Sequence, residues 1–448
     1  MQFVSDFHVH SKYSRAVSQA MVLSEMEKWS VKKGIDVVSA ADFTHPLWFR
    51  ELKAQLVQAE EGVYRLKNSD SKVRFILSTE ISSIYSQGGK TRRIHNLVFM
   101  PSLEAVERFN SELLKRGANL SADGRPIIGL SSRNLLELVL SADPNAFLIP
   151  CHVWTPWFSL YGSNSGFDLI TECFQDLSDE IHAVETGLSS DPEMNWRIKE
   201  LDNRSIVSFS DAHSAVKMAR EATVFGVQSS EFGIQNYSPS FREIKDAIKQ
   251  DPNSKLKIDY TIEFYPEEGK YHYTGHRNCK IVQSPSETKE KGFICPVCKR
   301  PLTVGVMHRV EKLASRPTNV KISIDNLGVS WVEDPTGLHS KYVKLVPLVE
   351  IIAESLGVMP GSIKVLAKFD EMVSTFGSEL QILLRTPISD IEKSSGEKIA
   401  EAISKVRKQD IVVDPGFDGE FGKVKIWGAE NIDAQSKKPQ PEEQMGLF

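Results

Sequence analysis

The chain has 448 residues, of which 41% are apolar and 25% are charged, and its formal net charge is −5. This composition is typical of a globular protein and excludes a low-complexity or fibrous chain. Because one hydrophobic core rarely serves more than about 300 residues, we expect two or more domains. We find no apolar run long enough for a signal peptide or a membrane span, so we expect a cytoplasmic protein that does not bind a membrane.

Histidine and acidic residues recur after apolar or β-branched runs along the first half of the chain. His8 and His10 stand two residues apart after one such run, and Asp211 and His213 after another. Because residues i and i+2 of an extended strand share a face, each pair projects to one side. Further residues of this kind end similar runs: Asp42, His45, Glu80, His95 and His152.

Polar residues at the carboxyl ends of successive parallel strands surround one pocket in a β/α barrel. Imidazole and carboxylate ligands suit ions such as Zn, Mn or Fe, and a carboxylate such as Glu80 can bridge two of them. A bridged pair of ions can hold a phosphate and a hydroxide nucleophile together. We therefore predict two or three divalent ions (Zn, Mn, Mg or Fe) in the barrel, with Glu80 and Asp211 as catalytic residues.

The order H-x-H, Asp-x-x-His, Glu, His, His, Asp-x-His resembles the PHP (polymerase and histidinol phosphatase) superfamily. The resemblance implies an α/β fold, a distorted (β/α)7 barrel over residues 1–255, with a trinuclear metal centre that hydrolyses phosphoesters. It also implies the ligand sets by position: His8, His10, Glu80 and Asp211 for one ion, Glu80, His95 and His152 for a second, and His213 with Asp42 or His45 for a third. The chain departs from the superfamily pattern at the third ion, because Asp42 and His45 are not adjacent.

Three of the five cysteines cluster with a histidine in the second half of the chain. His276-x-x-Cys279 and Cys295-x-x-Cys298 have the spacing of a zinc ribbon, and His272 is an alternative fourth ligand. We predict a closed structural Zn site in a small domain over residues 256–316. Metal binding would contribute the folding free energy that its modest apolar content cannot supply.

Positive charge is concentrated around the predicted ribbon. Residues 269–344 carry 13 Lys and Arg against 6 Asp and Glu, a segment charge of +7, which leaves −12 for the rest of a chain whose total is −5. A basic module attached to a metal hydrolase indicates a polyanionic substrate, bound through phosphate contacts whose strength falls as salt rises.

A mainly helical DNA-binding domain is expected over residues 317–430. Leu348, Ile351 and Leu356 have helical spacing in a segment that we expect to be helical from Pro347 to Leu384. Residues 391–403 then resemble a helix-hairpin-helix element with its turn at Gly396. Such a turn binds a DNA phosphate through backbone N–H groups, although an ordinary helical hairpin fits the same pattern.

The end of the chain, residues 431–448, is polar and we expect it to be disordered up to a short apolar terminus. That terminus resembles the sliding-clamp-binding motif of bacterial replication and repair proteins. The resemblance implies that four residues dock in a groove of the bacterial clamp: Gln444, Met445, Leu447 and Phe448.

Barrel, ribbon, hairpin and tail together resemble DNA-repair endonucleases of the PHP superfamily. The resemblance implies a monomeric, nucleoid-associated enzyme that cuts DNA on the 5′ side of deaminated bases (hypoxanthine, uracil, xanthine) and of abasic sites. A damaged base would be flipped into a pocket and stacked there. Candidate substrate-binding residues are Tyr13, Trp154, Trp157 and Arg309, with packing at the barrel mouth as the alternative for the aromatic ones.

Two other classes of protein are compatible with parts of the pattern. A small-molecule phosphomonoesterase of the histidinol-phosphatase type would use the same metal ligands but has no use for a basic ribbon or a clamp-binding tail. A non-catalytic DNA-binding adaptor would keep those appendages without needing the ligands. The combination of both features favours the endonuclease.

Overall fold

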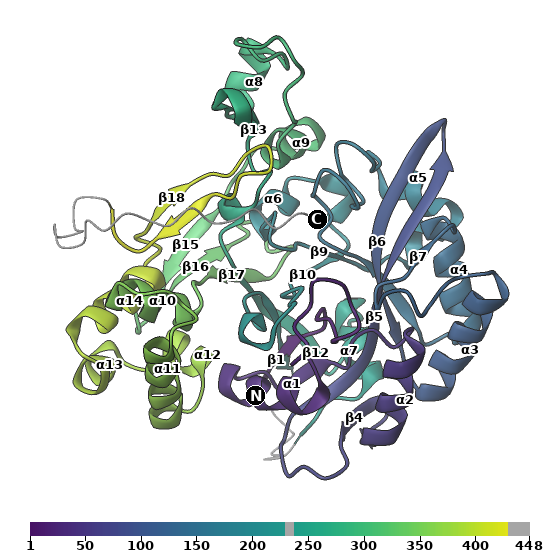
Figure 1. The fold of residues 1–448 in the computed structure, drawn as a ribbon, viewed down its shortest axis with the longest axis horizontal. Helices are drawn as coiled ribbons and strands as arrows, with labels where there is room; N and C mark the ends of the chain where they lie inside the picture. Colours follow the sequence, from purple (N-terminus) through teal and green to yellow (C-terminus); the bar gives the residue numbers. More distant parts are fainter. Residues whose placement is uncertain (229–236, 429–448) are drawn as a thin grey trace.

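A ring of strands forms the centre of the computed structural model, which describes residues 1–228 and 237–428 (Figure 1). In order around the ring the strands are β1 (Gln2–Asp6), β2 (Val37–Ser39), β5 (Arg74–Gln87), β6 (Lys90–Met100), β8 (Phe147–Pro150), β9 (Ala183–Glu185) and β10 (Ser205–Val207). The backbone N–H of Val153 donates to Glu185 O, which joins β8 to β9. A parallel bridge between Val9 and Ala212, just beyond β1 and β10, closes the ring.

The ring has a mixed sheet. β2 pairs in parallel with β1 and with β5, whereas β6 pairs antiparallel with β5 and with β8. No helix separates β5 from β6, because Gly88 and Gly89 both adopt positive φ and close a tight hairpin. Glu80 and His95 consequently lie inside long strands, not at strand ends as the sequence predicted. The mixed α/β class is confirmed, but the regular β/α alternation is wrong at this hairpin.

Aromatic side chains fill the interior of the ring. The ring centroid of Phe7 lies 5.1 Å from that of Phe209, 6.0 Å from Phe99 and 6.2 Å from Phe225. All four are buried, and each contributes roughly 2–3 kcal/mol by leaving water. The ring is therefore a packed core that supports the residues at its end.

Helices cover the outside of the ring. Ser102 caps the helix at 103–115 by accepting a hydrogen bond from the Ala105 N–H, and that helix buries Val106, Phe109 and Leu113. The helices of this part are α1 (Leu23–Lys33), α2 (Pro46–Gln55), α3 (Leu103–Lys115), α4 (Ser132–Ala142), α5 (Ile170–Phe174), α6 (Pro192–Trp196) and α7 (Phe241–Ile248). Short 3-10 turns are η1 (Gln175–Glu180), η2 (Lys199–Leu201), η3 (Ala215–Lys217), η4 (Pro266–Glu268) and η5 (Arg277–Cys279).

The sheet continues past the predicted domain boundaries. From β1 it runs through β11 (Ala222–Val227) and β12 (Leu256–Glu263) to β17 (Lys341–Lys344), β16 (Ser330–Glu333) and β15 (Lys321–Ile324). On the other side, β4 (Val63–Leu66) and β7 (Ile127–Ile128) pair with β5, and β3 (Leu56–Glu60) pairs with β4. The boundary predicted at residue 255 falls just before β12, which pairs with both β11 and β17.

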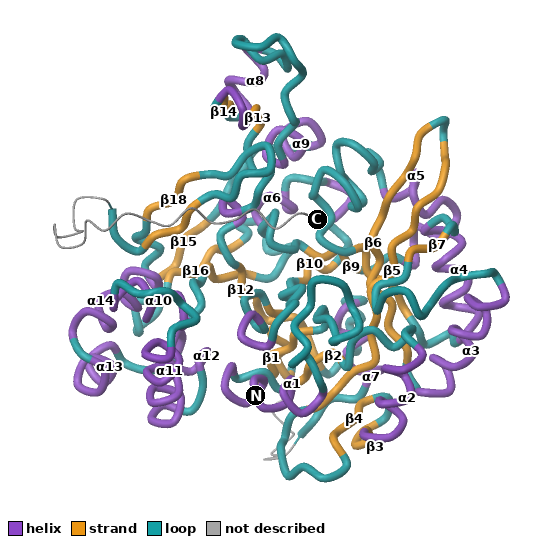
Figure 2. The backbone as a smooth tube through the Cα atoms, viewed as in Figure 1, coloured by secondary structure: helices purple, strands orange, loops and turns teal. Residues whose placement is uncertain are grey.

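The ribbon region is inserted between β12 and β15 and projects from the body (Figures 1 and 2). It contains β13 (Thr274–His276), β14 (Ile281–Gln283), α8 (Pro285–Lys291) and α9 (Val306–Leu313), joined largely by loops. Its base contacts the glycine-rich turn near Gly416, whose N–H donates to Glu267 O.

Five helices follow the sheet, as the expectation of a helical region requires: α10 (Leu348–Leu356), α11 (Ile363–Phe376), α12 (Glu379–Leu384), α13 (Ile388–Ser395) and α14 (Glu397–Arg407). Gly357 ends α10 with φ 66°, and Gly396, with φ 88°, forms the turn between α13 and α14. The buried ion pair between Lys33 and Glu379, 2.6 Å apart, holds these helices against α1. A small hairpin, β18 (Val412–Asp414) and β19 (Lys423–Lys425), completes the described chain.

None of the helices in residues 1–228 and 237–428 combines the length and the apolarity needed to cross a membrane.

Candidate metal centre

Four predicted ligands converge at one end of the ring. Ligand atoms of His8, His10, Glu80 and Asp211 all lie within 4.8 Å of one another. His10 Nε2 is 2.9 Å from Asp211 Oδ1, and His8 Nε2 is 3.6 Å from the same oxygen. His8, His10 and Asp211 stand just beyond β1 and β10, where strand ends were predicted, and Glu80 reaches them from within β5.

A second group shares Glu80 with the first. Glu80, His95 and His152 also place their ligand atoms within 4.8 Å of one another. Glu80 Oε1 lies 3.2 Å from His152 Nε2 and contacts His95 Nδ1, whereas Glu80 Oε2 lies 3.4 Å from His10 Nε2. One carboxylate thus turns an oxygen toward each group, which is the geometry of a ligand that bridges two ions.

The residues present fit divalent ions. His8 Nε2 and Glu80 Oε2 are buried and have no hydrogen-bond partner. Leaving such atoms unsatisfied costs about 1–3 kcal/mol each, which a bound cation would offset. Burial opposes ionisation, yet His95, His10 and His152 hold the pKa of Glu80 well below its usual range, so this group is a carboxylate.

Backbone strain is concentrated around the same residues. Asp42, His152, Phe158 and Asp211 have φ values of 39°, 30°, 63° and 48°, in a region that residues with side chains rarely adopt. Such strain persists only where the surrounding structure enforces it, and it is common at functional sites. This conformation has a cost in stability, and it occurs at two of the ligand residues, His152 and Asp211.

The residues expected at a third ion are not gathered in the same way. Asp42 Oδ2 accepts hydrogen bonds from Ser11 N, Ser11 Oγ and Ser14 Oγ at 2.6–2.8 Å. Its other oxygen lies 3.1 Å from His10 Nδ1. Asp42 is therefore engaged in orienting His10, which leaves little capacity for an ion of its own.

His45 and His213 contact neighbouring aromatic or imidazole rings. The His45 ring stacks on Tyr13 with centroids 4.3 Å apart. The His213 ring lies 4.8 Å from that of His10, and its Nδ1 is 2.8 Å from Asp211 O. Neither belongs to a group of metal-binding geometry among the described residues.

The sequence did not identify Glu185, which supports both groups. Its carboxylate is buried, with Oε1 2.8 Å from His8 Nδ1 and Oε2 accepting from the His152 N–H at 2.8 Å. The signal was present, because Glu185 ends the apolar run at 183–184 just as the predicted ligands end theirs. Neighbouring Cys151 has its pKa raised well above the usual range by burial, so it stays a neutral thiol in the core.

Two predicted substrate-binding residues serve packing instead. Trp154 is fully buried and its Nε1 donates to Asn195 Oδ1 at 2.8 Å, so neither ring face can stack on a base. Arg309 is also buried and donates to Tyr161 O, 2.8 Å, and to Asp168, 2.6 Å. It fastens α9 to the body through Nε and Nη2, and its burial keeps it from contact with DNA.

Tyr13 and Trp157 are better placed. Both are partly exposed. The Tyr13 hydroxyl donates to Glu51 at 2.8 Å while its ring stacks on His45. The Trp157 ring lies 5.5 Å from Tyr271 in an edge-to-face arrangement. These two remain candidates for contact with a base.

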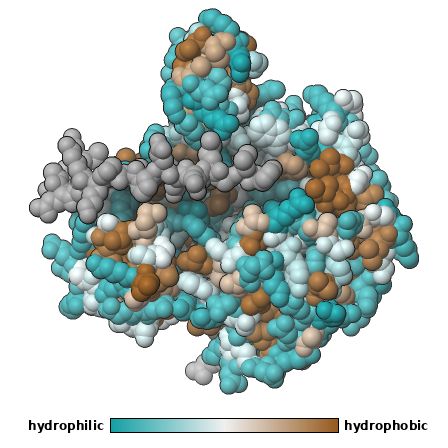
Figure 3. Space-filling model, in the orientation of Figure 1, coloured by the Kyte–Doolittle hydropathy of each residue, from teal (hydrophilic) through white to brown (hydrophobic). Residues whose placement is uncertain are grey.

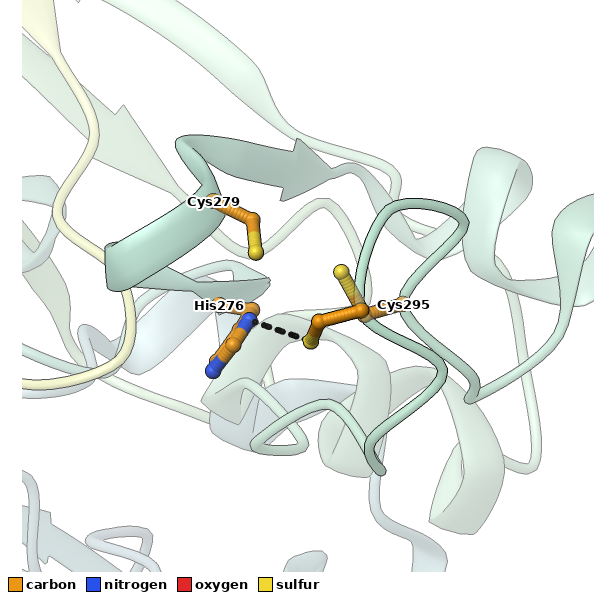
Figure 4. A group of neighbouring side chains, drawn as sticks. His276, Cys279 and Cys295 are labelled. Atoms are coloured by element: carbon orange, nitrogen blue, oxygen red, sulfur yellow. Dashed lines mark hydrogen bonds between the residues drawn. The ribbon is translucent and has the colours of Figure 1, made fainter.

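The ribbon residues form a separate group of metal-binding geometry. His276, Cys279, Cys295 and Cys298 place their ligand atoms within 4.8 Å of one another. Figure 4 shows His276 and Cys279 on one side of the group facing Cys295 on the opposite loop. The alternative ligand His272 lies outside the group. Three sulfurs and one nitrogen in this arrangement are consistent with tetrahedral Zn.

A tight backbone turn presents the two sulfurs of the second half-site. Cys295 N–H donates to Arg300 O at 2.8 Å, and Lys299 N–H donates back to Cys295 O at 3.0 Å. Burial opposes ionisation of Cys295, but the N–H groups of Cys298 and Val297 lower the pKa of Cys295 to about 6. The turn therefore favours the thiolate, the form that binds Zn.

The chain is similar in sequence to a known family and to two uncharacterized proteins. The family described as "MJ0043 C-terminal domain" matches residues 347–410, the region of α10 to α14. Uncharacterized protein YqxK of Bacillus subtilis is 29% identical over 406 residues, 88% of this chain and 90% of that one. Uncharacterized protein MJ0043 of Methanocaldococcus jannaschii is 32% identical over 273 residues, 60% of this chain, and the match spans only 31% of that protein.

Two solved structures match almost the entire chain. The lesion-specific endonuclease PfuEndoQ from Pyrococcus furiosus has a TM-score of 0.78 and 28% identity over 98% of this chain and 100% of that one. The chain resembles endonuclease Q. A structure of endonuclease Q in complex with a 27-mer duplex, which carries an abasic lesion at the active site, matches with the same TM-score and identity over 97% of this chain and 98% of that one.

The similarity to endonuclease Q confirms the resemblance expected from the combined motifs. It covers the ring, the ribbon and the helical region together, because 98% of the chain is aligned. The predicted clamp-binding residues Gln444, Met445, Leu447 and Phe448 lie outside the described residues.

Proposed function

We propose that this chain is a metal-dependent DNA-repair endonuclease. It would hydrolyse the phosphodiester bond on the 5′ side of a deaminated base (hypoxanthine, uracil or xanthine) or of an abasic site. The observation that carries the proposal is the pair of ligand groups sharing Glu80, in a fold similar to endonuclease Q over nearly the whole chain. The relative bound to an abasic duplex supports the inclusion of abasic sites.

His8, His10, Glu80 and Asp211 would hold one ion, and Glu80, His95 and His152 a second. When bound, such ions polarise the phosphate and lower the pKa of the attacking water. The third ion expected at His213 with Asp42 or His45 is not part of this proposal, because Asp42 is engaged with His10, Ser11 and Ser14.

The chain's own residues keep these ligands in register. Glu185 fixes the ring of His8 and the backbone of His152, and Asp42 fixes the ring of His10. A carboxylate partner on Nδ1 keeps the proton there and leaves Nε2 free as a ligand. Preorganised ligands of this kind need little rearrangement when the phosphate enters.

The projecting ribbon would bind the DNA backbone, with Zn as its structural metal. Lys299 and Arg300 are exposed on it, beside the exposed apolar residues Phe293, Ile294 and Val297. On the face seen in Figure 3 the ribbon combines hydrophilic and apolar surface. Contacts to phosphates supply affinity for DNA of any sequence. The backbone N–H groups at Gly396, in the hairpin of α13 and α14, would make contacts of the same kind.

The test is cleavage of duplexes labelled at the 5′ or 3′ end and carrying one hypoxanthine, uracil or abasic site, with Mn or Mg. We expect one cut on the 5′ side of the lesion and none in an undamaged duplex of the same sequence. A protein that hydrolyses only phosphomonoesters would belong to the histidinol-phosphatase alternative. Lesion-independent binding without cleavage would indicate a non-catalytic adaptor.

A further inference from the structure

An arginine faces the metal centre. Arg125 lies on the segment between α3 and β7, and its side chain is 22% exposed. Its Nε is 3.5 Å from Glu80 Oε2, the oxygen that belongs to the first ligand group. Within residues 1–228 and 237–428 the guanidinium donates no hydrogen bond and makes no other ion pair. Its donors are available to a further partner.

The backbone on both sides of Arg125 is fixed. Gly124 N–H donates to Tyr13 O at 3.0 Å, and Pro126 O accepts from the Ser82 N–H at 3.0 Å. A side chain at Gly124 would have its Cβ 2.5 Å from Asp42 Oδ2, so only glycine allows this approach. These contacts hold the backbone of Arg125 beside Glu80, so that its side chain has more freedom to adjust than the segment that carries it.

With divalent ions bound at Glu80, the position of this cation would be unfavourable unless an anion joined it. Divalent ions held by Glu80 would repel a guanidinium 3.5 Å from that carboxylate, because the charges have the same sign. A phosphate between them removes the conflict, since its oxygens can contact the ions and the guanidinium together. The planar fork of arginine also matches the spacing of two phosphate oxygens.

We propose that Arg125 is a catalytic residue that binds non-bridging oxygens of the scissile phosphate and stabilises the charge that develops on them. The proposal rests on the proposed function, because it takes the phosphodiester as the substrate of this pocket. Arg125 forms no covalent bond and transfers no proton. Removing a donor that acts on the transition state costs about 100-fold or more in kcat.

The experiment compares Arg125→Ala and Arg125→Lys with the wild type in three measurements: hydrolysis of bis(p-nitrophenyl) phosphate with Mn, bound Mn per chain, and affinity for inorganic phosphate by calorimetry. For Arg125→Ala we expect unchanged Mn content, weaker phosphate binding and a kcat about 100-fold lower. Added guanidinium should restore part of the rate. Arg125→Lys should lie between the two, because it keeps the charge without the fork.

Arg133→Ala is the matched control. Arg133 is a partly exposed arginine on α4 that pairs with Asp176 and Glu137, away from both ligand groups. It should leave all three measurements unchanged.

Unchanged kcat and phosphate affinity in Arg125→Ala would overturn the proposal. Loss of bound Mn in both Arg125 variants would also overturn it, by showing that Arg125 maintains the ligands. Failure of the proposed function is a different result. If the wild type cuts no DNA but binds phosphate through Arg125, the endonuclease is wrong and the role of Arg125 stands.

Discussion

Glu185→Gln should weaken metal binding in the barrel although Glu185 belongs to neither of the two ligand groups that share Glu80. The carboxylate accepts from two partners, His8 Nδ1 and the His152 N–H, both at 2.8 Å. Glutamine has one oxygen, so it can accept from only one of them. If its amide N–H₂ faces His8, the imidazole must carry its proton on Nε2 and can no longer use that atom as a ligand.

Glu185→Gln loses one buried hydrogen bond or places two donors against each other, which costs about 1–3 kcal/mol. Changing the partner of a metal-ligating histidine typically costs 10–100-fold in affinity or activity, which is the same range. We expect the Mn dissociation constant of the metal-free protein to rise about 10–100-fold, measured by titration calorimetry, with cleavage restored at high Mn.

Glu379→Gln is the matched control, because Glu379 is also a buried carboxylate, which accepts from the Leu348 N–H at 3.0 Å and pairs with Lys33. It should lower the free energy of unfolding without changing Mn affinity. Equal Mn affinity in Glu185→Gln and the wild type would refute the reasoning.

Four further changes have defined outcomes. Asp211→Ala should abolish cleavage while DNA binding measured by fluorescence anisotropy is retained, because the proposed role of this side chain is to hold an ion and it contributes little to the core. Cys298→Ser should lower Zn content by one equivalent, measured by mass spectrometry, and weaken DNA binding while small phosphodiesters are still hydrolysed. Deletion of 444–448 should leave cleavage unchanged and remove binding to the bacterial sliding clamp, expected at roughly micromolar affinity, in a pull-down. Burial raises the pKa of Glu263 from 4.5 to about 8. Between these pH values the folded protein binds more protons than the unfolded chain, so its free energy of unfolding falls as pH rises. Glu263→Gln should reduce this fall by a few kcal/mol, measured by urea unfolding at pH 5 and pH 8.

Much of the candidate site could be predicted from the sequence, because ligand chemistry depends on residue type and strand ends are marked by short apolar runs. His8 and His10 show this best, since their two-residue spacing fixes a common face. The Cys-His group of the ribbon could also be predicted, because the spacing of Cys295 and Cys298 is typical of a turn that presents two ligands to Zn.

The roles of some residues could not be predicted, because they depend on tertiary contacts that no local sequence pattern encodes. Glu185 meets His8 across 177 residues of sequence. Arg125 reaches Glu80 from a loop without regular structure. In the same way, Trp154 and Arg309 stand near suitable residues in the sequence, but their burial is decided by elements far away along the chain.

The most direct test of the account follows metal occupancy and lesion cleavage together. Metal-free protein is titrated with Mn, and bound Mn per chain is compared with single-turnover cleavage of a duplex carrying one deaminated base. We expect no cleavage without metal, a rate that rises with occupancy, and a single cut on the 5′ side of the lesion. Cleavage by the metal-free protein, or equal cleavage of the undamaged duplex, would contradict a metal-dependent, lesion-specific endonuclease.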